Sequence, residues 1–118
     1  RHTIQFCPGK NFEGTGPLGP WMMTPDEFGD PYAQSLTTRL NGEQVQHTII
    51  ADMDHKIDKQ IEYLSTIHTL RPGDIISTGT PGGVGSRREP PLWMKPGDTI
   101  SVEITGLSMI ESKIEQET

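Results

Sequence analysis

The sequence Arg-Pro-Gly-Asp-Ile-Ile-Ser-Thr-Gly-Thr-Pro-Gly-Gly-Val-Gly occupies residues 71–85 and predicts a turn, a strand and a glycine loop, in that order. Pro72-Gly73 suits the central positions of a type II turn, because proline presets φ at the first and glycine tolerates positive φ at the second. The β-branched pair Ile75-Ile76 then favours a strand. The glycines that follow expose backbone N–H groups, which suit a carboxylate, a phosphate or an oxyanion.

The spacing of these glycines matches neither common nucleotide-binding fingerprint. No Lys-Ser/Thr follows them, and their order is not that of the loop that opens a dinucleotide-binding helix. Pro81 also disfavours helical backbone at Thr80, which argues against a phosphate-binding helix at this point. The pattern leaves two interpretations open: a connection between strands that binds nothing, and a loop that binds an anion.

Composition predicts one turn-rich domain. The chain has 118 residues, enough for a core of its own, with 31% hydrophobic residues, 13 Gly and 10 Pro. Such a chain favours a mainly β architecture over a helical bundle. The net charge of −6 argues against nucleic acid or an anionic membrane surface as partner. No apolar run reaches membrane-spanning length, and the lone Cys7 excludes an internal disulfide and fits the reducing cytoplasm.

The clearest predicted element before the 71–85 stretch is a β-hairpin over residues 35–50. Apolar and polar residues alternate on both sides of Asn41-Gly42, the residue pair of a type I′ turn. His47 shares the predicted face of Val45 and Ile49. It is therefore expected to be half-buried, either packed among these neighbours or reaching into a site.

An amphipathic helix is predicted over residues 55–68, with one side packed on a sheet, because apolar residues recur there every three or four positions. Asp52 or Asp54 is expected to cap its N-terminus, where a carboxylate suits the helix dipole. A calcium loop is disfavoured because this segment lacks the required glycine and closing glutamate.

Shorter elements are predicted on both sides of these two. Residues 21–23 favour a strand, and Thr24 is the expected N-cap of one helical turn that starts at Pro25. Residues 86–91 favour a mobile loop. The Pro-Gly-Asp of residues 72–74 returns at residues 96–98, and the alternation that follows predicts two final strands, at residues 100–104 and 109–114.

Lys10 lies between Gly9 and Asn11 in a segment predicted to be irregular. A lysine in such a loop is usually a solvated surface charge. Desolvated beside a metal or a substrate carboxylate, it would instead stabilise a developing enolate.

Taken together, these motifs resemble the C-terminal part of the fumarylacetoacetate hydrolase family. The resemblance is carried by five segments that match the family in order and spacing: residues 8–14, 16–21, 38–43, 70–85 and 92–98. Residues 90–98, Pro-Pro-Leu-Trp-Met-Lys-Pro-Gly-Asp, resemble the bacterial hydratase and isomerase-like members more than the animal fumarylacetoacetate hydrolases. The resemblance implies one α+β domain over residues 1–118, mainly β with one amphipathic helix, as part of a mixed β-roll-like fold that usually forms a homodimer.

The resemblance also implies an enzyme that uses Mg²⁺ or Mn²⁺ and acts on small 2-oxo or enol acids, as in the catabolism of aromatic compounds. Hydrolysis of a C–C bond, isomerisation and decarboxylation remain open, because all three pass through an enolate. By position, Lys10 matches the family lysine that stabilises this enolate. Thr80, with the backbone of Gly79, matches the Gly-Thr-Pro segment that binds the substrate carboxylate.

The family's metal ligands, a Glu-x-Glu pair and an aspartate, have no counterpart in this chain and would precede Arg1. The expectation is therefore a piece of an enzyme that lacks its metal-ligand segment and is inactive by itself. Two other hypotheses stay open. The chain is a non-catalytic, dimerising β-domain or remnant, or it is an anion-binding module that uses only the loop at residues 79–85.

Overall fold

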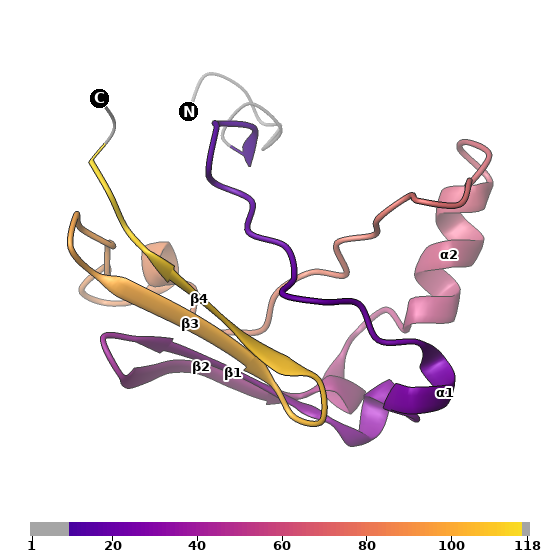
Figure 1. Ribbon diagram of the computed structural model, residues 1–118, viewed down its shortest axis with the longest axis horizontal. Coiled ribbons are helices and arrows are strands. Elements are labelled where there is room, and N and C mark those ends of the chain that lie inside the picture. The colour runs from indigo at the N-terminus through magenta and orange to yellow at the C-terminus, as the bar shows by residue number, and fades with distance from the viewer. Residues whose placement is uncertain (1–9, 117–118) are drawn as a thin grey trace.

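The centre of the molecule is one antiparallel sheet of four strands in the order β2-β1-β3-β4. The computed structural model describes residues 10–116, so Cys7 and the start of the 8–14 motif lie outside the described residues. β1 pairs with both β2 and β3, so two hairpins from distant parts of the chain form a single sheet (Figure 1). The mainly β architecture is confirmed. The strands are β1 Ser35–Leu40, β2 Glu43–Ile49, β3 Thr99–Ile104 and β4 Ser108–Lys113.

The first hairpin forms as predicted, with one irregularity in its ladder. Asn41 and Gly42 both have positive φ, 52° and 85°, as a type I′ turn requires. The register then shifts: Thr38 lies opposite Gln46, whereas Arg39 lies opposite Gln44. Val45 is the extra residue of this β-bulge, which turns Gln46 toward the face that carries Thr38.

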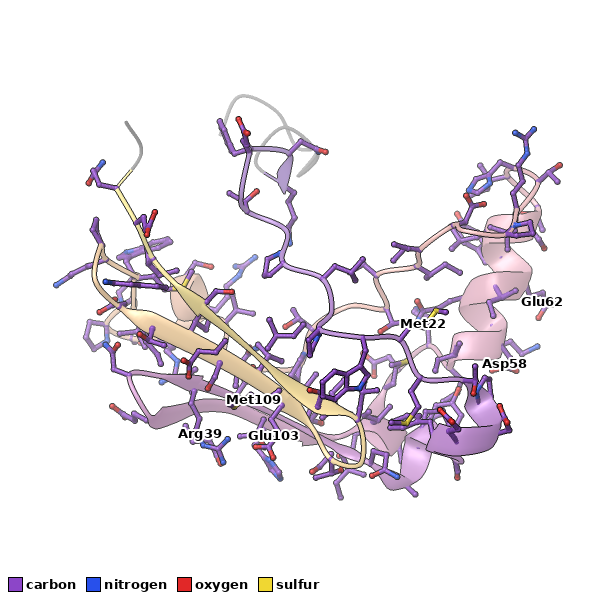
Figure 2. The ribbon with its side chains drawn as sticks, viewed as in Figure 1. Met22, Arg39, Asp58, Glu62, Glu103 and Met109 are labelled. Atoms are coloured by element: carbon purple, nitrogen blue, oxygen red, sulfur yellow. The ribbon has the colours of Figure 1, made fainter. Side chains whose placement is uncertain are left out.

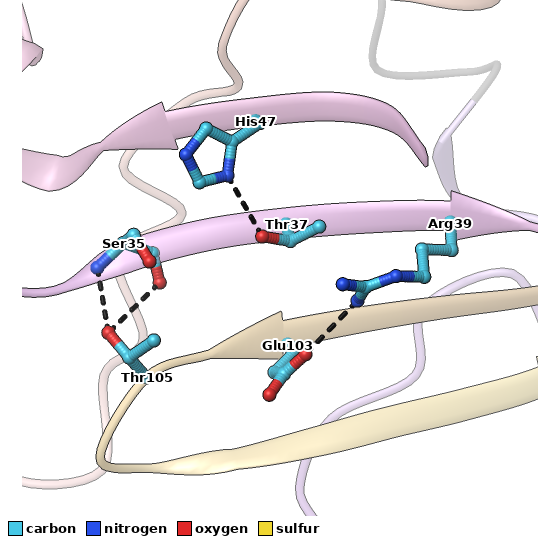
Figure 3. Close-up of polar contacts among 6 residues, drawn as sticks. All are labelled: Ser35, Thr37, Arg39, His47, Glu103 and Thr105. Atoms are coloured by element: carbon cyan, nitrogen blue, oxygen red, sulfur yellow. Dashed lines mark hydrogen bonds and ion pairs between the residues drawn. The ribbon is translucent and has the colours of Figure 1, made fainter. Parts of the chain in front are cut away.

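The two faces of the sheet differ in chemistry. The outer face is polar: the Thr37 hydroxyl lies 3.0 Å from Nδ1 of His47, and Arg39 forms a 3.1 Å ion pair with Glu103 (Figure 3). His47 is exposed, so the expectation that it is half-buried beside Val45 is wrong; the bulge places the two on different faces. The inner face carries both apolar and polar side chains. By register it consists of Leu36, Thr38, Leu40, Glu43, Gln46, Thr48, Ile100, Val102, Ile104, Ser108, Ile110 and Ser112.

The predicted helix is shorter than expected and lies beyond one end of the sheet. α2 spans Ile57–Ser65, and Asp58 and Glu62 point away from the sheet (Figures 1 and 2). Its apolar stripe is not packed on the sheet as predicted, since Ile61 remains 43% exposed. The predicted aspartate caps are also wrong. Lys56 is the N-cap residue, and the hydroxyl of Tyr32 accepts the Ile57 N–H at 2.8 Å instead.

Two predicted strands are absent from the described residues. Residues 21–23 and 75–78 form neither strand nor helix, and Met22 is 90% exposed. A strand needs a partner for its N–H and C=O groups, and no described segment pairs with either stretch. The remaining elements are short: α1 Pro25–Phe28, which starts after Thr24 as predicted, and the 3₁₀ turns η2 Pro31–Ala33, η3 Ile50–Asp52 and η4 Gly85–Arg87.

The described part of the chain is open rather than tightly packed. No apolar side chain within residues 10–116 is fully buried; the buried residues there are Thr37 and Thr38, at the middle of β1. The Cα radius of gyration is 15.8 Å, whereas a compact domain of this length has about 13.5 Å. The inner face of the sheet is thus only partly covered, and two cavities open over it.

Candidate functional site

The glycine loop at residues 79–85 lies over β2 in a conformation that depends on two of its glycines. Gly83 has φ +94°, and a Cβ at this position would lie 2.5 Å from the carbonyl oxygen of Val45. At Gly85, a Cβ would overlap the carbonyl oxygen of Leu92, whose N–H donates to the Gly85 carbonyl at 2.9 Å. Both are contacts with backbone, which cannot move aside easily. The loop therefore needs glycine at both positions in order to pack this closely.

Arg88 joins this loop to the bulge in β2. Its Nη2 donates to the carbonyl of Val45, the bulged residue, and its Nε donates to the carbonyl of Gly83 at 3.1 Å. The bulge therefore presents a carbonyl group that the guanidinium can reach. Residues 86–91 were predicted to be a mobile loop, but they contain part of η4 and this two-point contact of Arg88.

Gln46 makes a second connection, directly to Thr80 and its neighbours. Its Nε2 lies 3.3 Å from Oγ1 of Thr80, 3.1 Å from the carbonyl of Pro81 and 3.2 Å from the carbonyl of Gly82. On the other side of the loop, Gln60 of α2 donates to the carbonyl of Thr78 at 3.3 Å. The sheet thus contacts residues 80–82, and the helix contacts Thr78 just before the Gly-Thr-Pro segment.

Lys10 and Thr80 line the same cavity, of about 360 Å³. Its floor is the inner face of the sheet, and the glycine loop and residues 92–94 form its sides. Among the described residues that line it, Lys10 carries the only charged side chain. A lone cation in a mostly apolar cavity attracts anions, in a chain whose net charge is −6. The other walls include Thr38, Leu40, Val45, Trp93, Met94 and Ile100.

Gly79 lines a neighbouring, larger cavity of about 750 Å³ that Thr80 also borders. This cavity lies between the sheet and α2, with Leu36 and Ile104 on one side and Ile57 on the other. Gly79 has φ +111°, and a Cβ there would meet no other atom within 4 Å. The structure thus brings Lys10 and Thr80 to one cavity and places Gly79 at the boundary with the next.

Residues 10–116 contain no group of three or more His, Cys, Asp or Glu side chains that could hold a metal ion. The described residues therefore do not fit a metal site, so no ligand is assigned to any of them. The two acids with lowered pKa values lie outside the Lys10 cavity. A hydrogen bond with Thr24 lowers the pKa of Asp26, and one from Asn41 lowers the pKa of Asp98.

Sequence reasoning did not identify Gln46 and Arg88. Regular alternation along the strand predicts that Gln46 and Val45 lie on opposite faces of the sheet. The bulge at Val45 instead places Gln46 on the face of Thr38, where it contacts the loop. Arg88 follows another arginine in a polar, proline-containing segment, which is typical of a solvated surface. The glycines at positions 83 and 85 do indicate that this loop packs closely against another part of the chain, because glycine often occurs where two backbones approach each other.

Comparison with known proteins identifies the family to which this chain belongs. The model of the fumarylacetoacetate (FAA) hydrolase C-terminal family matches residues 1–115, and the chain belongs to this family. It is 41% identical over 114 residues to a rat protein, "Oxaloacetate tautomerase Fahd2a, mitochondrial"; the match covers 97% of this chain and 36% of the relative.

Two solved structures show the same likeness. The fumarylacetoacetate hydrolase from Exiguobacterium antarcticum superposes with a TM-score of 0.92 at 36% identity, covering 97% of this chain and 41% of that one. The maleylpyruvate hydrolase from Sphingobium sp. SYK-6, solved in complex with manganese(II) ion and pyruvate, gives 0.77 at 33% identity, covering 86% and 36%. The chain thus spans roughly two fifths or less of the length of these proteins. Within residues 10–116, no helix is both long and apolar enough to cross a membrane.

Proposed function

We propose that the protein containing this chain acts on 2-oxo or enol acids through an enolate, and that the cavity of Lys10 and Thr80 is part of its active site. Residues 1–118 would then form one part of the catalytic domain. The observation that carries the proposal is that Lys10 and Thr80, from distant segments, line one cavity with no other charged group among its described residues. Membership of a family whose members include a tautomerase and hydrolases of such acids supports it.

The proposed chemistry uses a positive charge and a hydroxyl group. When a bond to the carbon next to the keto group breaks, the departing proton or acyl group passes to water. The electron pair of that bond delocalises onto the keto oxygen, which becomes an enolate oxyanion. Lys10 is exposed and borders the cavity, and its ammonium group stabilises this charge. The Thr80 hydroxyl donates to the substrate carboxylate, and the backbone N–H of Gly79 is proposed as a second donor.

Replacement of Lys10 tests the first role. In the complete natural protein, Lys10→Ala is expected to lower kcat about 10²–10³-fold, the usual cost of losing one group that stabilises an oxyanion. Turnover is measured by the interconversion of keto and enol oxaloacetate and by hydrolysis of maleylpyruvate. Lys113→Ala, an exposed lysine on β4, is the matched control and should leave turnover unchanged. Full turnover by folded Lys10→Ala would overturn the assignment.

Replacement of Thr80 tests the carboxylate contact. Thr80→Ala is expected to raise KM about tenfold, because a hydrogen bond to a charged group contributes about 1.5–3 kcal/mol. Thr80→Ser keeps the hydroxyl, so its KM should be close to that of the natural protein. Equal KM values for all three proteins would contradict the role of Thr80.

We further propose that the complete protein uses Mg²⁺ or Mn²⁺ and forms a homodimer in the cytoplasm. The manganese in the related maleylpyruvate hydrolase supports the metal. Calorimetric titration with Mg²⁺ and oxalate should show tight, metal-dependent binding. Oxalate binding without metal would favour the anion-binding module. Absence of oxalate binding would favour the non-catalytic β-domain. Light scattering should give the mass of a dimer.

A further inference from the structure

Gln46 contacts three groups of the glycine loop, one in each of residues 80–82, and the chemistry of two of them fixes how its amide is oriented. The carbonyl oxygens of Pro81 and Gly82, 3.1 and 3.2 Å from Nε2, can only accept hydrogen bonds. The NH₂ group of the amide must therefore face the loop, and the amide oxygen must face away. Reversing the amide would place an acceptor against two acceptors.

This orientation determines what the Thr80 hydroxyl can do. Nε2 of Gln46 lies 3.3 Å from Oγ1 of Thr80 and can only donate, so Oγ1 accepts. A hydroxyl that accepts a hydrogen bond keeps its own hydrogen free for another acceptor. It also becomes a better donor, because chains of hydrogen bonds polarise one another. The Thr80 hydrogen is thus directed to an acceptor other than Gln46, as a bound carboxylate requires.

The position of Gln46 also suits a residue that acts through another. Gln46 is half-buried, lies on the inner face because of the bulge at Val45, and lines the Lys10 cavity. Two N–H groups serve three acceptors, so one of them is shared. The amide therefore joins the hydroxyl of Thr80 to the two backbone carbonyls that follow it, and fixes the loop relative to the sheet.

We infer that Gln46 is a positioning residue: its amide orients the Thr80 hydroxyl as a donor toward the carboxylate of a 2-oxo acid. This inference deepens the proposed function and rests on it. Gln46 itself need not touch the substrate. Its loss should therefore weaken anion binding in the same manner as loss of the Thr80 hydroxyl, and by way of that hydroxyl.

The test is a double-mutant cycle on the complete natural protein, with oxalate at saturating Mg²⁺ as the probe and its Kd measured by calorimetry. Gln46→Met keeps the length of the side chain but has no donor, and should raise Kd about tenfold, the value of one hydrogen bond to a charged group. In a Thr80→Ala background the same change should raise Kd less than about threefold, because interacting residues are not additive. An equal effect in both backgrounds would overturn the inference.

Three further variants separate positioning from simple packing. Gln46→Glu has the same shape but turns an acceptor toward the two carbonyls, so it should weaken binding more than Gln46→Met; equal or tighter binding would contradict the inference. Gln44→Met, on an exposed residue of the same strand, is the matched control and should leave Kd unchanged. Gln46→Asn, one methylene shorter, replaces Gln46→Met if that variant does not fold, with the same expected loss.

Failure of this inference differs from failure of the proposed function. If Thr80→Ala alone leaves oxalate binding unchanged, the carboxylate contact itself is wrong. If Thr80→Ala weakens binding but Gln46→Met does not, only the role of Gln46 is wrong.

Discussion

The two Pro-Gly-Asp turns, at residues 72–74 and 96–98, have the same local structure but continue differently. Gly73 and Gly97 both have φ +97°. In each turn the aspartate carboxylate accepts an N–H from three residues before, Arg71 or Lys95, at 2.7 Å. β3 begins directly after the second turn, whereas no described strand follows the first. The sequence of the turn therefore determines the turn but not the strand.

The second turn is connected to the sheet and the first is not. Asn41, in the hairpin turn, donates from Nδ2 to Asp98 at 2.9 Å and accepts the Thr99 N–H at 2.9 Å. The Ile114 N–H donates to the Asp98 carbonyl at 2.8 Å. Within residues 10–116, the hydrogen bonds of residues 71–74 stay inside their own turn. The two turns thus have the same local structure, but only the second is hydrogen-bonded to the sheet. Substitutions in each turn can test this difference.

The largest expected effect comes from Asn41, which links the hairpin to the second turn. Asn41→Ala should lower the free energy of unfolding by about 2 kcal/mol: about 1 for a non-glycine residue in left-handed backbone and about 1 for the lost hydrogen bonds. Asn41→Gly is the control, since it tolerates the φ of 52° and loses only the amide. Its expected loss is about 1 kcal/mol by urea unfolding. Equal losses would show that the backbone conformation costs nothing here.

A smaller effect is expected from placing Ala at the two glycines with φ +97°. Gly97→Ala should cost about 1 kcal/mol, because the strain falls on a turn that the sheet holds in place. Gly73→Ala introduces the same backbone strain, and its added Cβ would meet no other atom within 4 Å. It should cost less, since its turn can relax without disturbing a strand. Thermal unfolding of both variants measures the difference, and equal costs would show that the first turn is held as firmly as the second.

The smallest effect is a dependence of stability on pH that involves the second turn. Hydrogen bonds, first from Asn41 and then from the Lys95 N–H, lower the pKa of Asp98 in the folded protein. Because the folded pKa lies below the unfolded value of about 3.9, the stabilisation is present above that value and is lost as the pH falls through the folded pKa. Urea unfolding of Asp98→Asn should vary less with pH in this acidic range. An unchanged profile would exclude a contribution from Asp98.

The other sequence predictions also differ in this way: those that depend on neighbouring residues are confirmed, and those that depend on distant segments are wrong. The hairpin and its Asn-Gly turn formed as predicted, because the signal lies in adjacent residues. The cap of α2 was wrong, because Tyr32 from a distant segment supplies the oxygen. The strand expected at residues 75–78 was also wrong, since no described segment offers it a partner.

For the candidate site, the sequence singled out Lys10 and Thr80 as a loop cation and a residue of the glycine loop. Their roles stay predictions, but the structure places both on one cavity. Gln46 and Arg88 could not be found in the same way. Their contacts depend on the bulge at Val45, and no residue near Val45 in the sequence indicates a change of register.

The sequence by itself determined the turns, the strand alternation and the chemical groups of the site, because these depend on the φ preferences and side chains of neighbouring residues. Only the tertiary structure decided which β-prone stretches became strands and which face of the sheet Gln46 occupies. Strands and ladder register depend on hydrogen bonds between segments that are distant in the chain. A single extra residue in β2 therefore determines what holds the loop of Thr80.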